Sequence, residues 1–209
     1  IMEGQYQNSS ENSEYKKHQL NTNWIVWYHN PSDKSWSLDS YKSILELSYL
    51  EDFLVLKNSW AECLPSASEG MFFLMRKIKN TVIYPQWEDE NNKQGGYWSF
   101  KIPKETSHDI WLKLCSYTIG EQLCNNVTDS LQINGISISP KKNFCIIKIW
   151  NNNQSKNNVN ILSDEMTFLD KNEVKYSSHN NNIQRDYNKF YKKENRRYKK
   201  GYNKNRNRY

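Results

Sequence analysis

A tryptophan and three consecutive acidic residues, Trp87-Glu88-Asp89-Glu90, stand together in a chain whose overall charge is positive. The carboxylate of Glu88 can accept two hydrogen bonds side by side, and a guanine base donates two in that arrangement from N1–H and its N2 amino group. The indole of Trp87 offers a face for stacking. Alkylation at N7 makes the base cationic and adds an attraction of about 0.5–2 kcal/mol to the indole. The pair Trp87-Glu88 therefore indicates a site for 7-methylguanine.

A second aromatic ring would let such a site clamp the base between two indoles. Trp36 is the natural candidate, because it lies in the polar segment DKSWSLD, where its ring has no obvious core to join. The alternative is that Trp36 covers a sheet edge. Taken alone Trp36 favours that alternative, whereas its occurrence with Trp87 and Glu88 favours a base-binding site.

Three lysines are candidates for neutralising phosphates attached to the base. Lys141 and Lys142 belong to the hairpin sequence PKKNF, and Lys148 lies in the strand that follows it. Because side chains alternate along a strand, Ile146, Lys148 and Trp150 should share one face. The alternative is that the lysines only keep the exposed edge of a hairpin from pairing with another strand. A lysine that shares a strand face with an isoleucine and a tryptophan favours a site that binds an anion.

Six segments between the polar ends of the chain have the composition of strands. They are residues 24–29, 71–75, 97–102, 131–138, 144–150 and 174–178. Residues 131–138 alternate apolar and polar side chains, which is the period of a half-buried strand. Loops of Asn, Ser, Pro and Gly separate the segments.

Helices interrupt this series of strands. The sequence from Ser48 to Glu51 has the pattern of a capping box, and the apolar residues Leu50, Phe53, Leu54 and Leu56 follow it. A second helix is predicted from residue 109, because a mainly apolar set of side chains falls on one helical face: Ile110, Trp111, Leu114, Cys115 and Thr118. A short third helix is predicted near Ser163. Strands with a few inserted helices predict an α+β fold, in which an antiparallel sheet carries helices on one face and leaves the other open to a ligand.

The length of 209 residues suits one domain with tails, and we place the domain at residues 18–179. Residues 1–17 are polar and are predicted to be a disordered tail. Residues 180–209 are rich in Lys, Arg, Asn and Tyr and hold almost no aliphatic residue, which predicts a second disordered tail. The alternative for this basic tail is a loose contact with nucleic acid, in which tyrosines stack on bases.

The bulk composition indicates which kinds of partner, binding site and cellular location to expect. A net charge of +6 permits an anionic partner, and 14% aromatic residues at a mean hydropathy of −0.97 indicate a small aromatic core or stacking surfaces.

Four cysteines without a CxxC pair and four scattered histidines predict buried free thiols and neither metal nor cofactor. Without a signal-peptide pattern or an apolar run of membrane-spanning length, the expected location is the cytoplasm. The abundance of Asn and Lys is typical of A+T-rich coding DNA, as in some protists or large DNA viruses.

Several motifs, taken in order, carry a family resemblance that covers residues 18–179. They are HQLNTNWIVWY, DKSW, YLEDF, PQWEDENNKQGGYW, IWLKLCSYTIGE, IIKIW and KYSSH. Together they resemble the translation initiation factor 4E family, which binds the 7-methylguanosine 5′ cap of mRNA. The WEDE…GGYW run is the most specific of them.

The resemblance implies a curved antiparallel sheet of about eight strands, with three helices on the convex face and the cap site in the concave face. It also implies binding rather than catalysis. By position, it assigns the cap-stacking rings to Trp36 and Trp87, the guanine edge to Glu88, the N7-methyl contact to Trp150, and the phosphates to Lys141, Lys142 and Lys148.

The phosphate region departs from the family pattern. Lys141 stands at the position of an arginine, and Ile146 at the position of a lysine, while Lys148 supplies a charge two residues later on the same face. Lysine offers a point charge rather than a planar fork, so the phosphate geometry is expected to differ. Tyr97 replaces a basic residue before Trp98.

The convex face departs as well. In the family, a tryptophan after Glu-Asp-Phe grips a scaffold protein or repressor that carries a helical motif; here that position is Leu54. Lys113 replaces an acid, and Gln19 replaces the proline after the opening histidine. We therefore expect a scaffold partner with a non-standard binding motif. The expected partner surface consists of His18, Leu50, Leu54, Leu112 and Lys113.

The sequence suggests four candidate functions. The first is a cap-binding initiation factor, favoured because both stacking positions keep tryptophan. The second is a cap-binding translational repressor that does not recruit the usual scaffold, favoured by the altered convex face. The third is a general single-stranded RNA binder driven by the basic tail. An enzyme acting on capped RNA is disfavoured, because no acid cluster joins Glu88 and Asp89 to complete a metal site.

Overall fold

The computed structural model describes residues 16–206 and contains one antiparallel sheet. The strands lie in the order β2-β1-β3-β6-β7-β5-β8, and the short β4 pairs with β3. This arrangement confirms the predicted α+β class and the sheet of about eight strands. The strands are β1 (Gln19–His29), β2 (Tyr41–Tyr49), β3 (Met71–Ile78), β4 (Thr81–Val82), β5 (Gly96–Pro103), β6 (Ile133–Pro140), β7 (Phe144–Asn151) and β8 (Lys175–Ser178).

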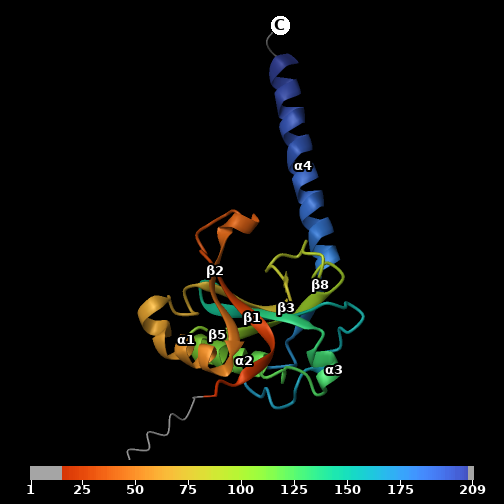
Figure 1. The fold of residues 1–209 in the computed structure, drawn as a ribbon. Coiled ribbons are helices and arrows are strands. Elements are labelled where there is room, and N and C mark those ends of the chain that lie inside the picture. Colours follow the sequence, from red (N-terminus) through yellow and green to blue (C-terminus); the bar gives the residue numbers. More distant parts are fainter. Residues whose placement is uncertain (1–15, 207–209) are drawn as a thin grey trace, which may run out of the picture.

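Three helices lie on one face of the sheet, and a fourth projects from the opposite side (Figure 1). The three are α1 (Leu50–Cys63), α2 (Ser107–Ile119) and the single turn α3 (Val127–Ser130); the fourth is α4 (His179–Arg206). Two 3₁₀ turns, Leu38–Ser40 and Val159–Ile161, lie in loops. We call the sheet face under α1 and α2 the helix-covered face, and the other the open face.

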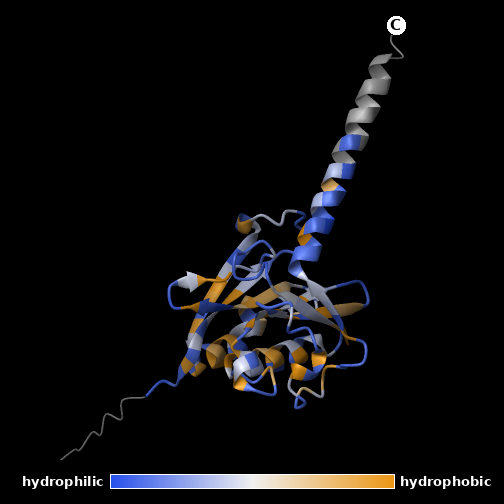
Figure 2. Ribbon diagram, turned by 90° about the vertical axis from the view of Figure 1, so that its right-hand side faces the viewer, coloured by the Kyte–Doolittle hydropathy of each residue, from blue (hydrophilic) through white to orange (hydrophobic). Residues whose placement is uncertain are grey.

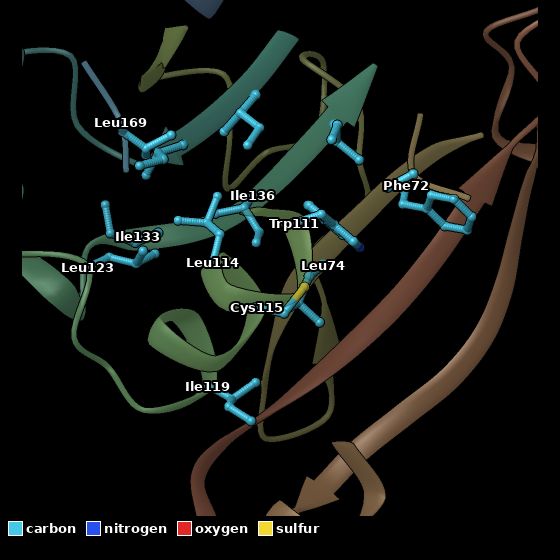
Figure 3. Packing of buried hydrophobic residues seen from close by; sticks show 14 of the residues in the cluster. Phe72, Leu74, Trp111, Leu114, Cys115, Ile119, Leu123, Ile133, Ile136 and Leu169 are labelled. Atoms are coloured by element: carbon cyan, nitrogen blue, oxygen red, sulfur yellow. The ribbon is translucent and has the colours of Figure 1, made fainter. Parts of the chain in front are cut away.

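Alternation along the strands divides the buried apolar side chains between these two faces. In β1, Trp24 and Val26 join the large cluster on the helix-covered face, whereas Ile25 and Trp27 join a smaller cluster on the open face. Figure 3 shows part of the large cluster, with Trp111, Leu114 and Cys115 of α2 and side chains from the sheet. The smaller cluster is mainly aromatic, so the open face of the sheet carries an apolar layer of its own.

Strand β2 and the start of α1 differ from the sequence prediction. Residues 41–49 form an edge strand that runs directly into α1, and the predicted capping box at Ser48 and Glu51 does not form. Instead the Asp52 carboxylate accepts hydrogen bonds from the backbone N–H groups of Ser48 (2.9 Å) and Tyr49 (2.8 Å). The cap therefore lies one residue later than predicted, and Glu51 is left to bind His18.

The short helix predicted near Ser163 is absent from the structure, and that prediction is wrong. Leu162 pairs with Cys124 in an isolated β-bridge, and the backbone N–H of Ser163 donates to the carbonyl of Leu123 at 3.0 Å. These bonds to another segment hold the chain extended at the point where the helix would begin. The residues that follow form turns.

The basic segment from residue 180 to 206 is helical, which differs from the disordered tail that we expected. The first turn of α4 is anchored, because His179 and Asn182 are buried, and an anchored turn removes the cost of nucleating a helix. Composition showed only that the segment cannot build a core. Residues 1–15 of the other predicted tail, and residues 207–209, lie outside the described residues.

Figure 2 shows the coloured part of α4, next to the domain, as predominantly hydrophilic, and apolar residues concentrated in α1, α2 and the sheet. Among residues 16–206, no helix combines the length and the apolar composition that a bilayer span requires.

Candidate functional site

A cavity of about 420 Å³ lies on the open face of the sheet. Its walls come from the loop after β1, the first residue of β2, the loop between β4 and β5, strands β3, β6 and β7 with their hairpin, and the second turn of α4. Six residues singled out in the sequence line it: Trp36, Trp87, Glu88, Lys141, Lys148 and Trp150. Residues separated by more than a hundred positions are thus brought to one site.

Trp36 forms one wall of the cavity and is half exposed. One face of its indole stacks on the imidazole of His29, with ring centroids 4.4 Å apart and planes within 7° of parallel. His29 is buried, and its Nε2 donates to the backbone carbonyl of Ser35 at 2.9 Å. The histidine therefore supports one indole face and fixes the ring that lines the cavity.

The loop that carries Trp87 and Glu88 is held by its neighbours. The Asp89 carboxylate accepts backbone N–H groups from Tyr84 (3.0 Å) and Asn91 (2.8 Å). The side chain of Asn92, which is buried, donates to the carbonyls of Tyr84 and Gln86, both at 2.8 Å. Asp89 therefore shapes the turn that carries Trp87 and Glu88.

Glu88 is exposed at the cavity, and its carboxylate makes no hydrogen bond or ion pair with any residue of the described part of the chain. Burial raises the pKa of the neighbouring Tyr41 hydroxyl, and the negative charge of Glu88 raises it further. Tyr41 lines the same cavity and therefore stays protonated. The site thus presents a carboxylate acceptor with unoccupied lone pairs.

The glycine pair Gly95-Gly96, at the start of β5, is explained by close backbone approach. A Cβ atom on Gly95 would lie 1.8 Å from the carbonyl oxygen of Asn151, and one on Gly96 would lie 2.4 Å from that of Ser177. Neither glycine has a positive φ. The pair lets β5 pack between β7 and β8, which sets Tyr97 opposite Trp150 in the strand register.

Lys148 lies between aromatic rings at the cavity. Its Nζ is 4.1 Å from the ring centroid of Tyr97 and 5.7 Å from that of Trp87. Burial lowers its pKa to about 8, with help from the positive charges of Lys141 and Arg185. No carboxylate of the described residues pairs with it. An incompletely solvated cation without a counter-ion favours binding of an anion at this point.

The other two lysines are placed differently. Lys141 lines the cavity from the β6–β7 hairpin, where its backbone N–H donates to the carbonyl of Phe144 at 2.8 Å. Lys142 is exposed on the same hairpin and is not among the lining residues.

Trp150 is buried, and its ring edge faces a polar partner. Its Nε1 donates to the hydroxyl of Ser137 at 3.0 Å. The ring packs against His179 at a centroid distance of 4.9 Å and an interplanar angle of 38°. His179 is fully buried, and no described residue makes a hydrogen bond to either of its ring nitrogens. Burial together with nearby Lys148 lowers its pKa to about 4. The imidazole is therefore neutral and acts as an aromatic support for Trp150.

Sequence reasoning missed several residues of the site, among them Tyr41, Ser137 and Asp186, which line the cavity, and His179, which packs against Trp150. Ser137 and Tyr41 lie in strands where polar or aromatic residues are common, so neither gave a distinct signal. His179 is the last residue of the predicted domain and gave no signal of its own, whereas Asp186 lies in the segment that we expected to be disordered. Among residues 16–206, no three His, Cys, Asp or Glu side chains gather as they would around a metal ion.

The residues expected on the convex face lie at the helix-covered face. The Nδ1 of His18 is 2.7 Å from the Glu51 carboxylate, which also accepts the backbone N–H of His18 at 3.0 Å. Leu50 and Leu54 of α1 are 39% and 45% exposed. In α2, Leu112 is half-buried and the ammonium of Lys113 lies 4.5 Å from the ring centroid of Phe168. The start of α1 thus presents exposed leucines beside His18.

These features define a single-sheet α+β protein with a cavity lined by tryptophan, glutamate and lysine on its open face. The family model described as eukaryotic initiation factor 4E matches residues 19–195, and the chain belongs to that family. Over 139 residues the chain is 31% identical to eukaryotic translation initiation factor 4E of Eremothecium gossypii; this match covers 64% of the chain and 62% of that protein.

Solved structures of this family are similar in fold. The crystal structure of Ascaris suum eIF4E-3 with an m7G cap aligns with 69% of this chain and 79% of its own, at a TM-score of 0.57 and 26% identity. The complex of Caenorhabditis elegans eIF4E-3 with the 4E-binding protein Mextli and cap analog aligns with 81% of this chain and 96% of its own, at a TM-score of 0.66 and 24% identity.

Proposed function

We propose that this protein binds the 7-methylguanosine 5′ cap of mRNA in the open-face cavity and acts in translation initiation in the cytoplasm. The observation that carries the proposal is the joint presence of Trp36, Trp87, Glu88 and Lys148 at one cavity, where neither charged group pairs with any residue that the structure describes. The Ascaris suum relative whose structure is described with an m7G cap gives independent support.

The chemistry assigns each residue a part. A methylated, cationic guanine stacks between the indoles of Trp36 and Trp87, and its N1–H and N2 amino groups donate to the Glu88 carboxylate. Trp150 contacts the N7-methyl group. The base is held by stacking, charge and two directed hydrogen bonds, which together favour the methylated cap over unmodified guanosine.

The phosphates lie toward the lysines in this proposal. Lys148 and Lys141 bind the triphosphate directly, and Lys142 adds charge from the outer side of the hairpin. Tyr97 does not supply the basic group expected at its position; it is buried and holds Lys148 over its ring at 4.1 Å. Ile146 lies on the same strand without a charge. Phosphate binding therefore depends on Lys148 more than on any other residue.

The proposal is tested by retention on immobilised 7-methyl-GTP. Trp36→Ala, Trp87→Ala and Glu88→Ala should each remove most of the retention while circular dichroism shows an intact fold. Loss of one stacking ring is expected to cost about 1–3 kcal/mol. Elution with GTP instead of 7-methyl-GTP serves as the control for methyl specificity. Unchanged retention in two of the three variants would reject the site.

The partner of the helix-covered face is proposed to be a scaffold protein with a non-standard helical motif. The relative described with the 4E-binding protein Mextli supports a protein partner. Leu54 offers less contact area than a tryptophan, and Lys113 carries a positive charge where the family has an acid. The surface comprising His18, Leu50, Leu54, Leu112 and Lys113 should therefore prefer a different sequence from the usual YxxxxLΦ motif. A pull-down with a YxxxxLΦ peptide should recover little of this protein, and strong recovery would contradict the proposal.

A translational repressor is the second candidate function, and the exposed leucine at position 54 favours it. A repressor would bind the cap through the same cavity but would not recruit the scaffold. Tethering the protein to a reporter mRNA separates the two functions, because an initiation factor raises translation of the reporter and a repressor lowers it.

A further inference from the structure

Helix α4 follows directly on β8 and extends away from the domain (Figure 1). Asp186 lines the cavity, and the Asn182 side chain donates to the Tyr97 hydroxyl at 3.3 Å. After this anchored start, side chains from Arg185 to Lys192 are exposed. The helix is therefore fixed at one end beside the cap site, and its exposed surface is accessible to a partner.

The positive charge of the protein is concentrated in this segment. Residues 180–209 contain eleven Lys and Arg against two Asp and Glu, whereas the whole chain contains 29 against 23. Residues 1–179 therefore hold 18 basic against 21 acidic residues and are net negative. Apart from the lysines at the cavity, net charge therefore draws an anionic partner toward α4 more than toward the rest of the surface.

The basic residues of the described part follow the helix axis. Arg185, Lys189 and Lys192 are spaced at i, i+4 and i+7, which places them along one side of α4. Arg185 is also close enough to the cavity for its charge to act on Lys148. Lys189 is paired with Asp186 at 2.9 Å, so the charge of α4 that acts on the lysines assigned to the cap phosphates is that of Arg185.

Exposed aromatic rings accompany these charges. Tyr187, Phe190 and Tyr191 are 58%, 63% and 56% exposed, and the rings of Tyr187 and Tyr191 lie 5.4 Å apart. Phe190 lies one turn beyond Asp186, on the side of the helix that begins at the cavity. Tyr187 and Tyr191 lie on roughly the opposite side of α4 from the row of cations. A single strand that winds over the helix can therefore pair its phosphates with the cations and stack its bases on the rings, which is the combination that binds single-stranded nucleic acid.

We propose that α4 is an RNA-binding arm that holds the nucleotides following the cap. This inference rests on the proposed cap-binding function. At 1.5 Å per residue its 28 residues extend over about 42 Å, so the arm is long enough to follow several nucleotides as they leave the cavity. An RNA fits this surface better than an acidic protein does, since its chain emerges where α4 starts and its unpaired bases match the exposed rings.

The test compares three ligands by fluorescence anisotropy competition at fixed salt. They are 7-methyl-GpppG, a capped 12-nucleotide RNA and the same RNA without a cap. The wild-type protein should bind the capped RNA at least tenfold more tightly than 7-methyl-GpppG. The double variant Lys189→Glu/Lys192→Glu should lose most of this advantage and the salt dependence that accompanies it, with less than a twofold change for 7-methyl-GpppG.

The matched control is Lys57→Glu/Lys79→Glu, which makes the same charge change at two exposed lysines outside α4. It should retain the advantage of the capped RNA. Equal affinities of the wild type for capped RNA and 7-methyl-GpppG would overturn the inference, and so would an α4 variant that keeps the full advantage. An α4 variant that loses affinity for poly-glutamate but not for RNA would assign the helix to a protein partner and also overturn it.

Failure of the cap-binding proposal gives a different result. In that case 7-methyl-GpppG does not bind, and the uncapped RNA decides the role of α4. Binding of the uncapped RNA that the α4 variant loses and the control variant keeps would support an RNA-binding helix. No binding of the uncapped RNA would overturn it.

Discussion

The side-chain amide of Gln86 donates a 3.0 Å hydrogen bond to the backbone carbonyl of Trp36. This bond joins the loop after β1 to the loop before β5, and each loop carries one of the two tryptophans that line the cavity. Both loops are polar and lie at the surface, where a ligand would otherwise have to order them. The bond holds the two walls of the cavity in one arrangement before a ligand enters.

Gln86→Ala should weaken binding of 7-methyl-GTP about threefold to tenfold, because the loops lose a bond worth about 0.5–1.5 kcal/mol. The melting temperature should hardly change, since both loops are exposed. Isothermal titration calorimetry measures the affinity, and Gln94→Ala, at an exposed glutamine of the same loop, is the control. Equal affinities of the two variants would show that the bond does not organise the site.

Gly95→Ala should destabilise the domain by more than about 2 kcal/mol. The added methyl group would lie 1.8 Å from the backbone oxygen of Asn151, and a strand backbone cannot yield as a flexible side chain can. Gly120→Ala is the matched control, because its nearest neighbour is 3.2 Å away, and it should change stability by about 1 kcal/mol or less. Urea denaturation measures both, and similar midpoints would contradict the role of close approach.

Raising the pH from 7 to 9 should weaken binding of 7-methyl-GTP more in the wild type than in Lys148→Arg. The pKa of Lys148 is lowered to about 8, so above that pH the free protein loses the cation that binds the phosphates. Arginine stays charged throughout this range. Titration of the ligand is common to both proteins and cancels in the comparison. Parallel pH profiles would show that Lys148 does not bind phosphate.

Lowering the pH from about 6.5 to 4 should destabilise the fold through His179. Its pKa is about 4 in the folded state and near 6.5 in an unfolded chain, so in this range the unfolded state binds more protons. Stability is therefore lost as the pH falls. His179→Phe keeps the aromatic contact with Trp150 and should lose less stability over the same range, by about 1–3 kcal/mol. Identical pH profiles of the melting temperature would contradict this assignment.

The sequence predicted residues of the site where a residue type has few roles other than ligand binding in its local setting. The Trp87-Glu88 pair, the lysine and tryptophan on one face of β7, and Trp36 in a polar loop all led to one cavity. Strand β2 escaped prediction because it is an edge strand with Ile44 and Leu45 partly exposed, so its pattern does not alternate cleanly. No local pattern reports such long-range pairing.

Helix α4 escaped prediction for a different reason. Low aliphatic content excludes a packed core, but it does not exclude a helix whose first turn is held by the domain. The anchor consists of Asn182 against Tyr97 and His179 against Trp150, and these contacts depend on the completed sheet. The same contacts explain why His179 and Asp186 were missed as residues of the site.

The most direct test of the cap-binding account is a tryptophan-fluorescence titration of the wild type and Glu88→Gln with 7-methyl-GTP and with GTP. The wild type should bind 7-methyl-GTP at least tenfold more tightly than GTP. Glu88→Gln should bind 7-methyl-GTP more weakly than the wild type by at least tenfold, because a neutral amide can neither accept both base protons nor balance the methylated ring. Equal affinity of the wild type for the two nucleotides, or unchanged binding by Glu88→Gln, would contradict the account.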